Sequence, residues 1–384
     1  MKTSRMYKAC VPLMSLGLAL GSGGGLDSSW AQAPAAAVAN NTSAAPARTP
    51  QELVNRCVEY LRVRGQAEDG SFSAASGIGP TGLVVSGLLS AGLTPQDPMV
   101  AKGLAYLNQF VQPDGGIYRP DSSHRNYDTC IVLVALTKAN TNGQYDERIA
   151  RAEKFVKGIQ WDEGEDKDPS DLFYGGAGYG SHSRPDLSNT SFLIDALKAV
   201  GTDENDEAMQ KALLFVSRCQ NLESPANISP HAAKINDGGF YYTVADGGES
   251  KAGNEPNGGL RSYGSMTYAG LKSMIYAGVD QDDPRVKAAV DFLRKHYTLE
   301  SNPGVGQQGL FYYYHTMAKA LAALEQPQFV DANGTPHDWK AELIAKLSEL
   351  QQADGSWVNP TTRWMEGDPN LVCGYVLLAM EYLK

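Results

Sequence analysis

The chain has 384 residues, of which 42% are hydrophobic, and a formal net charge of −10 at neutral pH. This length and apolar content suffice for one sizeable core. The acidic charge, and the lack of a basic stripe with interleaved aromatic residues, exclude nucleic acid as an expected partner.

The first 31 residues have the pattern of a secretory signal peptide. Three basic residues precede an apolar run over 11–20, and small residues lead up to Ala31. We therefore predict export to the periplasm or the medium, with cleavage after Ala31. The run is too short for a membrane helix, and no later segment resembles a membrane span. Residues 32–48, rich in Ala, Asn, Ser and Pro, are predicted to be a disordered lead-in.

From residue 49 onward, two kinds of helical segment alternate. One kind is amphipathic, as in 54–61, 100–111 and 286–293, and its single apolar face predicts a position outside a core. The other kind is apolar or small almost all round, which predicts an inner position. The inner segments are 83–89, 131–136, 192–197, 266–275, 317–324 and 372–380.

A turn built on Asp-Gly or Gly-Gly plus an aromatic residue recurs between these segments. The clearest copies are 66–72, 112–118, 236–241 and 352–357, and looser copies occur at 174–176 and 308–311. A unit repeated this often indicates a closed or stacked array. We predict that residues 49–384 form one all-α domain, an α6/α6 toroid of six outer and six inner helices with glycine-rich loops at the rim.

These turns, together with Tyr127-Asp128-Thr129 and Tyr314-His315-Thr316 at two inner-helix starts, resemble the repeats of a known family. It comprises squalene and other terpenoid cyclases and the β subunits of protein prenyltransferases. The resemblance covers residues 50–384 and implies an α/α toroid. It leaves the activity open, because the same toroid also carries binding domains and unrelated enzymes.

Two catalytic motifs of that family have partial counterparts here. Class II terpenoid cyclases donate a proton from an Asp-x-Asp-Asp motif, and this chain contains Asp280-Gln281-Asp282-Asp283. The segment precedes Pro284, so we interpret it as the turn from an inner helix to the next outer helix, where carboxylates cap helices. Full cyclases of this type also use two such domains, whereas one is predicted here.

Prenyltransferase β subunits hold a catalytic zinc with residue types that match Asp128, Cys130 and His315. These three come from the second and fifth units, whose helix axes would be roughly 16–20 Å apart across a ring. Zinc bonds measure about 2.0–2.3 Å. We therefore predict no metal site and no cofactor, and we leave open whether the protein is an enzyme.

Aligning the inner segments predicts a ring of different groups at one mouth of the toroid. The aligned residues are Pro80, Asp128, Asn189, Tyr263 and His315. If the mouth is a pocket, Asp128 and His315 are the candidate catalytic acid and base. The candidate ligand contacts are Asn189, Tyr263, Tyr241, Tyr242, Tyr312 and Tyr313. The alternative is that Asp128 and Asn189 cap helices and that His315 is a satisfied buried histidine.

Loops supply the remaining candidates. The segment 357–370 carries Arg363, Trp364, Glu366 and Asp368, which suit ligand contact, although an Arg-carboxylate pair that holds the loop down explains them equally well. The glycine-rich linkers 162–187 and 221–260 are long enough to be lids or binding loops. Four cysteines lie in apolar helical segments and are predicted to be buried free thiols, and Cys57 and Cys373 would meet if the ring closes.

Three functions remain open on these observations. The first is an isoprenoid-binding or terpenoid-cyclase-like protein with a small apolar ligand. The second is a non-catalytic module that binds another protein. The third is an exported carbohydrate-active enzyme that stacks sugars on aromatic rings. The lining of the central cavity discriminates among them.

Overall fold

The computed structural model describes residues 48–180 and 183–384, which belong to one compact unit. The predicted signal peptide and all of the predicted lead-in except Arg48 lie outside the described residues. In the part that is described, no helix combines the length and the apolar character that crossing a bilayer requires.

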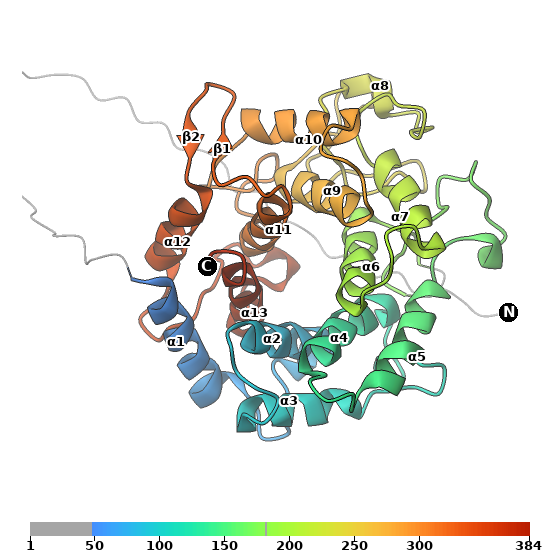
Figure 1. Cartoon of the computed structure of the whole chain (residues 1–384). Coiled ribbons are helices and arrows are strands. Elements are labelled where there is room, and N and C mark those ends of the chain that lie inside the picture. Colours follow the sequence, from blue (N-terminus) through green and yellow to red (C-terminus); the bar gives the residue numbers. More distant parts are fainter. Residues whose placement is uncertain (1–47, 181–182) are drawn as a thin grey trace, which may run out of the picture. The chain divides into compact units, whose positions relative to one another are not determined.

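Six inner helices form a closed ring (Figure 1). They are α2 (Gly79–Ser90), α4 (Arg125–Ala139), α6 (Leu187–Val200), α9 (Gly264–Tyr276), α11 (Leu310–Ala323) and α13 (Pro369–Met380). Each packs on the next in chain order, and α13 packs on α2. These helices contain the six apolar segments of the sequence, so the predicted α/α toroid is confirmed.

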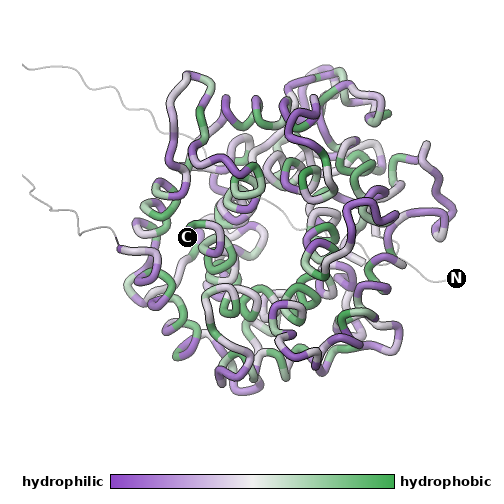
Figure 2. Tube along the Cα trace, in the orientation of Figure 1, coloured by the Kyte–Doolittle hydropathy of each residue, from purple (hydrophilic) through white to green (hydrophobic). Residues whose placement is uncertain are grey.

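Six outer helices surround this ring (Figure 1). They are α1 (Pro50–Tyr60), α3 (Pro98–Asn108), α5 (Asp146–Lys157), α7 (Glu207–Arg218), α10 (Pro284–Lys295) and α12 (Trp339–Leu350). Hydrophilic and hydrophobic residues alternate along the outer helices, as expected of helices with one wet face (Figure 2). Asp97 and Asp283 cap α3 and α10 by accepting backbone N–H groups.

Short elements occupy the connections. They are the single turns η1 (Leu61–Gly65), η2 (Ala74–Ser76), η3 (Glu163–Glu165) and η4 (Arg363–Met365), the short helix α8 (Ala232–Ile235), and the strands β1 (Phe329–Val330) and β2 (Pro336–His337). The two strands pair antiparallel with Phe329 opposite His337, in the connection between α11 and α12. The sequence analysis did not predict this small hairpin.

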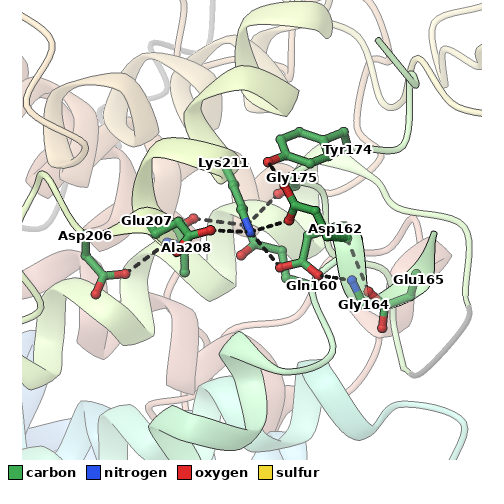
Figure 3. Close-up of polar contacts among 11 residues, drawn as sticks. Gln160, Asp162, Gly164, Glu165, Tyr174, Gly175, Asp206, Glu207, Ala208 and Lys211 are labelled. Atoms are coloured by element: carbon green, nitrogen blue, oxygen red, sulfur yellow. Dashed lines mark hydrogen bonds and ion pairs between the residues drawn. The ribbon is translucent and has the colours of Figure 1, made fainter. Parts of the chain in front are cut away.

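A repeated glutamine joins four of the turns to the next outer helix. The side-chain amide of Gln66 donates to the carbonyl oxygen of Gly70 at 3.1 Å and to that of Met99 in α3 at 2.8 Å. The same pair of bonds links Gln160 to Gly175 and Ala208 (Figure 3), Gln220 to Gly238 and Arg285, and Gln351 to Gly355 and Leu53. Buried carbonyl groups need such partners, so this glutamine fixes the spacing between units.

The turn glycine is required by close backbone approach. Gly70 has a φ of +91°, and a Cβ at this position would lie 2.4 Å from the carbonyl oxygen of Lys102 in α3. Gly355 has a φ of +95° and the same 2.4 Å approach to the carbonyl oxygen of Arg56 in α1. Only glycine fits both the left-handed backbone and the missing space.

A repeated threonine sets the register of the inner helices. The Thr81 hydroxyl accepts the N–H of Phe72 at 2.9 Å, so the turn is tied to the first residues of α2. Thr129, Thr190 and Thr267 accept the N–H groups of Ile117, Ala177 and Phe240 in the same way, at 2.9–3.0 Å. The fifth unit departs from this pattern, because Thr316 bonds only within α11, to the carbonyl oxygens of Tyr312 and Tyr313.

All four cysteines of the described region are buried free thiols, as predicted. The ring closure also brings Cys57 of α1 beside Cys373 of α13, and the two thiols share a hydrogen bond. Burial and this neighbour raise the pKa of Cys57 well above its ordinary value.

Candidate functional site

A cavity of 470 Å³ lies at the N-terminal ends of the inner helices, and we call it the mouth cavity. Eight aromatic side chains dominate its lining. They are Tyr127, Tyr179, Phe192, Tyr242, Tyr263, Tyr312, Trp364 and Tyr375. Two carboxyl groups, Asp128 and Glu366, and one lysine, Lys251, also line it. The predicted mouth therefore exists as a pocket.

Asp128 is the carboxyl group best placed for proton transfer in this cavity. It is the fourth residue of α4 and is only 3% exposed. Its Oδ2 accepts the Ser122 hydroxyl at 3.0 Å, and the carboxyl group also accepts the backbone N–H of Gly79. Burial raises the pKa of Asp128 to about 6, against the opposing effect of these hydrogen bonds and of Arg119. The group can therefore hold or release a proton near neutral pH.

Aromatic rings make a continuous band around the cavity wall. Phe192 of α6 contacts Tyr127 edge-on, with ring centroids 5.2 Å apart, and lies 6.3 Å from Tyr312 of α11. Tyr312 in turn contacts Tyr375 of α13 at 5.8 Å. Such a band offers π faces both to an apolar ligand and to positive charge.

A second buried carboxyl group stands behind this wall. Asp186 caps α6 and accepts both the backbone N–H of Asn189, at 2.9 Å, and its side-chain amide, at 2.7 Å. It also bonds the hydroxyl of Tyr242. Burial raises the pKa of Asp186 to about 6. Asn189 therefore bonds Asp186, and it also hydrogen-bonds Tyr179 of the wall. It is not part of the cavity lining itself, whereas the neighbouring Ser188 is.

The structure separates Asp128 from His315. His315 is the sixth residue of α11 and lines a different cavity of 210 Å³ at the C-terminal ends of the inner helices, which we call the rear cavity. Burial lowers the pKa of His315 well below its ordinary value, and Lys319 adds to that effect. The two candidates for acid and base therefore do not act on one site, and Tyr312 takes the place at the mouth where His315 was expected.

The threonine register explains this difference. The residue before each bonded threonine is Pro80, Asp128, Asn189 and Met266. In the fourth unit it is therefore Met266 that corresponds to Asp128, and Tyr263 lies three residues earlier. Tyr263 still lines the cavity, as does Pro80. In α11 the motif Tyr-His-Thr lies two residues deeper in the helix than the motif Tyr-Asp-Thr does in α4, so the local sequence match was misleading.

Only one member of each predicted tyrosine pair reaches the cavity. Tyr242 and Tyr312 line it, whereas Tyr241 and Tyr313 are fully buried elsewhere. The Tyr241 hydroxyl donates to the carbonyl oxygen of Arg218, and that of Tyr313 to the carbonyl oxygen of Thr298, both at 2.7 Å. Successive side chains point in different directions on helices and extended chains, so adjacent residues rarely share one wall.

The loop 357–370 contributes two lining residues of the four that were predicted. Trp364 and Glu366 line the cavity. Glu366 accepts the backbone N–H of Tyr312 at 2.8 Å and the side-chain amide of Asn359 at 2.7 Å, so its carboxylate caps α11. Arg363 stacks on Trp364 and hydrogen-bonds Gln308. Asp368 caps α13. Backbone capping by Glu366, rather than an Arg-carboxylate pair, holds this loop.

Sequence reasoning missed several wall residues. Tyr127 and Tyr375 lie on inner helices, and Tyr179 comes from the linker 162–187. The backbone N–H of Asn126 donates to the carbonyl oxygen of Tyr179 at 2.9 Å and so ties this linker to α4. Lys251, which was also missed, comes from the linker 221–260, as does the predicted Tyr242. Both long linkers thus supply cavity walls. Their glycine-rich composition and length were the signal for this role, but not for the individual residues.

The predicted helix-capping role of Asp280-Gln281-Asp282-Asp283 is confirmed. The segment connects α9 to α10, away from the mouth cavity. Asp283 accepts the N–H of Arg285 at 2.8 Å. Asp282 is 91% exposed and pairs with Lys287.

Metal ligands do not converge in the described part of the chain. Across residues 48–180 and 183–384, no group of three or more His, Cys, Asp or Glu side chains is arranged to hold a metal ion. Cys130 instead donates its thiol to the side-chain oxygen of Asn126 at 3.3 Å, away from His315.

Comparison with known proteins gives one related sequence segment. An 89-residue stretch, 23% of this chain, is 36% identical to squalene–hopene cyclase of Zymomonas mobilis subsp. mobilis, and it spans 12% of that protein's length. No protein-family model matches the sequence.

Solved structures with the same fold cover most of the chain. A family 88 glycosyl hydrolase from Bacteroides vulgatus superposes on 88% of this chain and 99% of its own, with a TM-score of 0.53 and 10% identity. The type II terpene cyclase MstE from Scytonema superposes on 87% of this chain and 97% of its own, with a TM-score of 0.53 and 13% identity. A family 76 glycoside hydrolase from a bovine Bacteroides thetaiotaomicron strain superposes on 86% of this chain and 78% of its own, with a TM-score of 0.54 and 10% identity.

These comparisons define the class of protein. The chain has the α/α toroid fold that the repeats of the sequence implied, and one segment of it is similar to squalene–hopene cyclase. At these identities the structural matches establish the fold alone.

Proposed function

We propose that the protein binds an apolar, isoprenoid-like ligand in the mouth cavity and that Asp128 donates a proton to it. The observation that carries this proposal is the placement of the buried Asp128 carboxyl group, whose pKa is raised, inside a cavity walled by eight aromatic rings. A carboxylic acid can protonate an alkene or an allylic oxygen. The surrounding π faces then stabilise the positive charge that develops on the ligand.

The residues around Asp128 suit a proton donor. The Ser122 hydroxyl and the Gly79 N–H both donate to this carboxyl group, and therefore favour the carboxylate that remains after proton transfer. Burial has the opposite effect and keeps a fraction of the group protonated at neutral pH. The balance sets the pKa near 6, which is suitable for general acid catalysis close to neutral pH.

The relatives support an enzyme of this kind. Terpene cyclases and glycoside hydrolases share the toroid, and squalene–hopene cyclase shares a stretch of sequence. Glycoside hydrolysis usually needs two free carboxyl groups. The second carboxyl group of the mouth cavity, Glu366, is occupied by the backbone of α11 and by Asn359. This favours the isoprenoid over the glycan ligand.

We also propose that the protein acts after export, with residues 1–31 as its signal peptide and 49–384 as the working domain. The acidic composition and the N-terminal pattern of the sequence support this. Expression of the full chain in a bacterial host, followed by N-terminal sequencing of the fraction outside the cytoplasm, tests it. The expected first residue is Gln32. An intact N-terminus in the cytoplasmic fraction alone would contradict export.

The test of the ligand uses the purified protein with prenyl alcohols of 10, 15 and 20 carbons. Calorimetry measures binding, and mass spectrometry of extracts detects rearranged products. We expect binding by at least one alcohol, and a loss of turnover of about 10²–10⁴-fold in Asp128→Asn with binding retained. Asp282→Asn is the matched control, because it changes a carboxyl group of the Asp-x-Asp-Asp turn outside the cavity.

Three outcomes would count against this proposal. Binding of oligosaccharides but of no prenyl alcohol would favour the glycan reading. A protein that co-purifies in fixed ratio, with no small-molecule binding, would favour an interaction module. Equal loss of turnover in Asp128→Asn and Asp282→Asn would show that Asp128 is not the proton donor.

A further inference from the structure

The rear cavity contains a buried group of charges that the proposed proton transfer does not use. Asp195 of α6 accepts Lys272 of α9 at 2.6 Å and Lys319 of α11 at 2.7 Å. The side chains of these three residues are 10%, 1% and 13% exposed. Lys319 and Asp195 line the cavity.

This triad carries an unbalanced positive charge. Burial alone would raise the pKa of Asp195. The two ammonium groups outweigh burial and hold this pKa at about 2, so Asp195 is ionised. Burial lowers the pKa of Lys272 to about 8, so that group is still mostly protonated at neutral pH. Two cations and one anion remain. Buried charges are normally paired, so one further anion is expected nearby.

The other carboxylate of the cavity is already paired with a lysine of its own. Glu381 is the other carboxylate in the lining, and it bonds Lys138 at 2.9 Å and Ser90 at 2.8 Å. Lys198, at the exposed end of α6, adds another positive charge to the rim. Helix dipoles attract cations to C-terminal turns. Lys272 and Lys319, however, precede the last four residues of their helices, so the dipole alone does not explain them.

One residue of this cavity also has a polar atom without a partner. His315 is 4% exposed and lines the rear cavity, and its Nδ1 has no hydrogen-bond partner in the described structure. A buried ring nitrogen left unpaired costs free energy, and a bound ligand would remove that cost. His315 stacks on Tyr375 of the mouth cavity, with ring centroids 5.7 Å apart.

The two cavities lie along one axis. On α4, Asp128 lines the mouth cavity, Ile131 and Val134 line the apolar part of the rear cavity, and Lys138 lies at its far end. These residues follow at intervals of three or four, so they form one stripe. Ten residues of helix span about 15 Å. Phe192 lines both cavities, so the two adjoin at this side chain.

We propose that the rear cavity binds the anionic head group of the ligand, a phosphate or carboxylate, next to Lys319, Lys198 and His315. This inference deepens the proposed function and rests on it for the apolar part of the ligand. The hydrocarbon chain then passes the apolar residues and Phe192 and ends among the aromatic rings at Asp128. The ligand is an amphiphilic anion, and its charged end fixes which carbon atoms lie beside the acid.

The test compares three probes with the full exported protein. They are farnesyl monophosphate, farnesol and inorganic phosphate, with calorimetry for the first two and thermal unfolding for phosphate. We expect farnesyl monophosphate to bind about tenfold more tightly than farnesol, because charge-assisted hydrogen bonds form only with the phosphate. The difference should shrink as the salt concentration rises.

Two variants and a control locate the head group. Lys198→Met changes an exposed side chain and should fold normally, and Lys319→Met removes a cation of the triad. Each is expected to reduce the preference for the phosphate to less than about threefold, while farnesol binding is kept. Lys102→Met, on the exposed face of α3, is the control and should keep the preference.

The outcomes separate this inference from the proposed function. If farnesol binds and farnesyl monophosphate binds no more tightly, the anion site is overturned and the mouth ligand is not. The same holds if the preference for farnesyl monophosphate over farnesol is unchanged in Lys198→Met and in folded Lys319→Met. Stabilisation by inorganic phosphate that Lys198→Met abolishes, with no farnesol binding, supports the anion site and contradicts the apolar ligand. Absence of binding by all three probes overturns both.

Discussion

Gln351, at the end of the last outer helix, donates its side-chain amide to the carbonyl oxygen of Leu53 in the first outer helix, at 3.0 Å. The same amide group donates to Gly355 of its own turn at 3.0 Å. This is the bond pair by which Gln66, Gln160 and Gln220 join their turns to the next outer helix. The last turn is therefore joined to the first outer helix by the same pair of hydrogen bonds that joins earlier turns to their next outer helices.

Gln351→Ala should destabilise the ring closure. The change removes the side-chain donor from the carbonyl oxygens of Leu53 and Gly355, and a buried polar group left unsatisfied costs about 1–3 kcal/mol. We expect the free energy of unfolding to fall by about 2 kcal/mol or more in urea titrations. Gln352→Ala, at the exposed neighbouring position, should change it by less than about 0.5 kcal/mol. Equal effects at the two positions would contradict the structural role of the amide.

Gly355→Ala separates the cost of close approach from that of backbone conformation. The new Cβ would lie 2.4 Å from the carbonyl oxygen of Arg56. Gly92→Ala is the matched control, because Gly92 has a similar φ of +97° but no heavy atom within 4 Å of the new Cβ. The control should lose about 1–2 kcal/mol from the left-handed backbone alone. Gly355→Ala should lose clearly more, and a similar loss in thermal unfolding of both variants would be evidence against this reason.

The fold was predictable because its signals are local and repeated. Each unit carries an apolar inner helix, an amphipathic outer helix and a glycine turn, and six copies constrain one another. The glutamine and threonine bonds explain why the turn pattern is so regular. The candidate site was predicted less well, because one cavity collects side chains from many units and its lining depends on the register of each helix.

Particular residues show where that register was lost. Asp128 was found because it follows the common alignment of the inner helices and precedes the bonded Thr129. His315 precedes Thr316 in the same local pattern, yet Thr316 makes no bond to a turn, and α11 begins five residues before His315. Lys272 and Asp195 gave no signal at all, since they pair across 77 positions of the sequence.

The stability of the protein should depend on pH through Asp128. Its pKa is raised from 3.8 to about 6 in the folded state. Between these values the folded protein binds more protons than the unfolded chain, so this group lowers stability as the pH rises from about 4 to 6. Each pKa unit corresponds to about 1.4 kcal/mol, which gives about 3 kcal/mol in all.

Asp128→Asn tests this dependence, because asparagine does not ionise. The stability of the variant relative to the original protein should increase between pH 4 and pH 7, as measured by urea unfolding at four pH values. Asp186 has a similarly raised pKa and remains in both proteins, so its contribution cancels from the comparison. A constant difference between the two proteins across this range would show that Asp128 titrates as an ordinary exposed carboxyl group.

Asp195→Asn should have one of the largest effects on stability in this protein. The variant leaves Lys272 and Lys319 as buried cations without their shared carboxylate. Breaking a buried pair from one side typically costs about 3–5 kcal/mol, and we expect a loss of this size in urea unfolding at pH 7. Asp121→Asn, at a side chain that is 78% exposed, should cost little.

The pH dependence of that loss identifies its cause. Because burial lowers the pKa of Lys272 to about 8, this ammonium group can lose its proton as the pH rises. Asp195 holds the pKa of both lysines up, so without it the pKa of Lys272 and that of Lys319 should fall, and the loss should become smaller between pH 7 and pH 9. Lost packing would instead give the same loss at every pH, since asparagine and aspartate have nearly the same shape. A loss that stays constant over this range would therefore show that the charges of the triad do not determine the stability of the rear cavity.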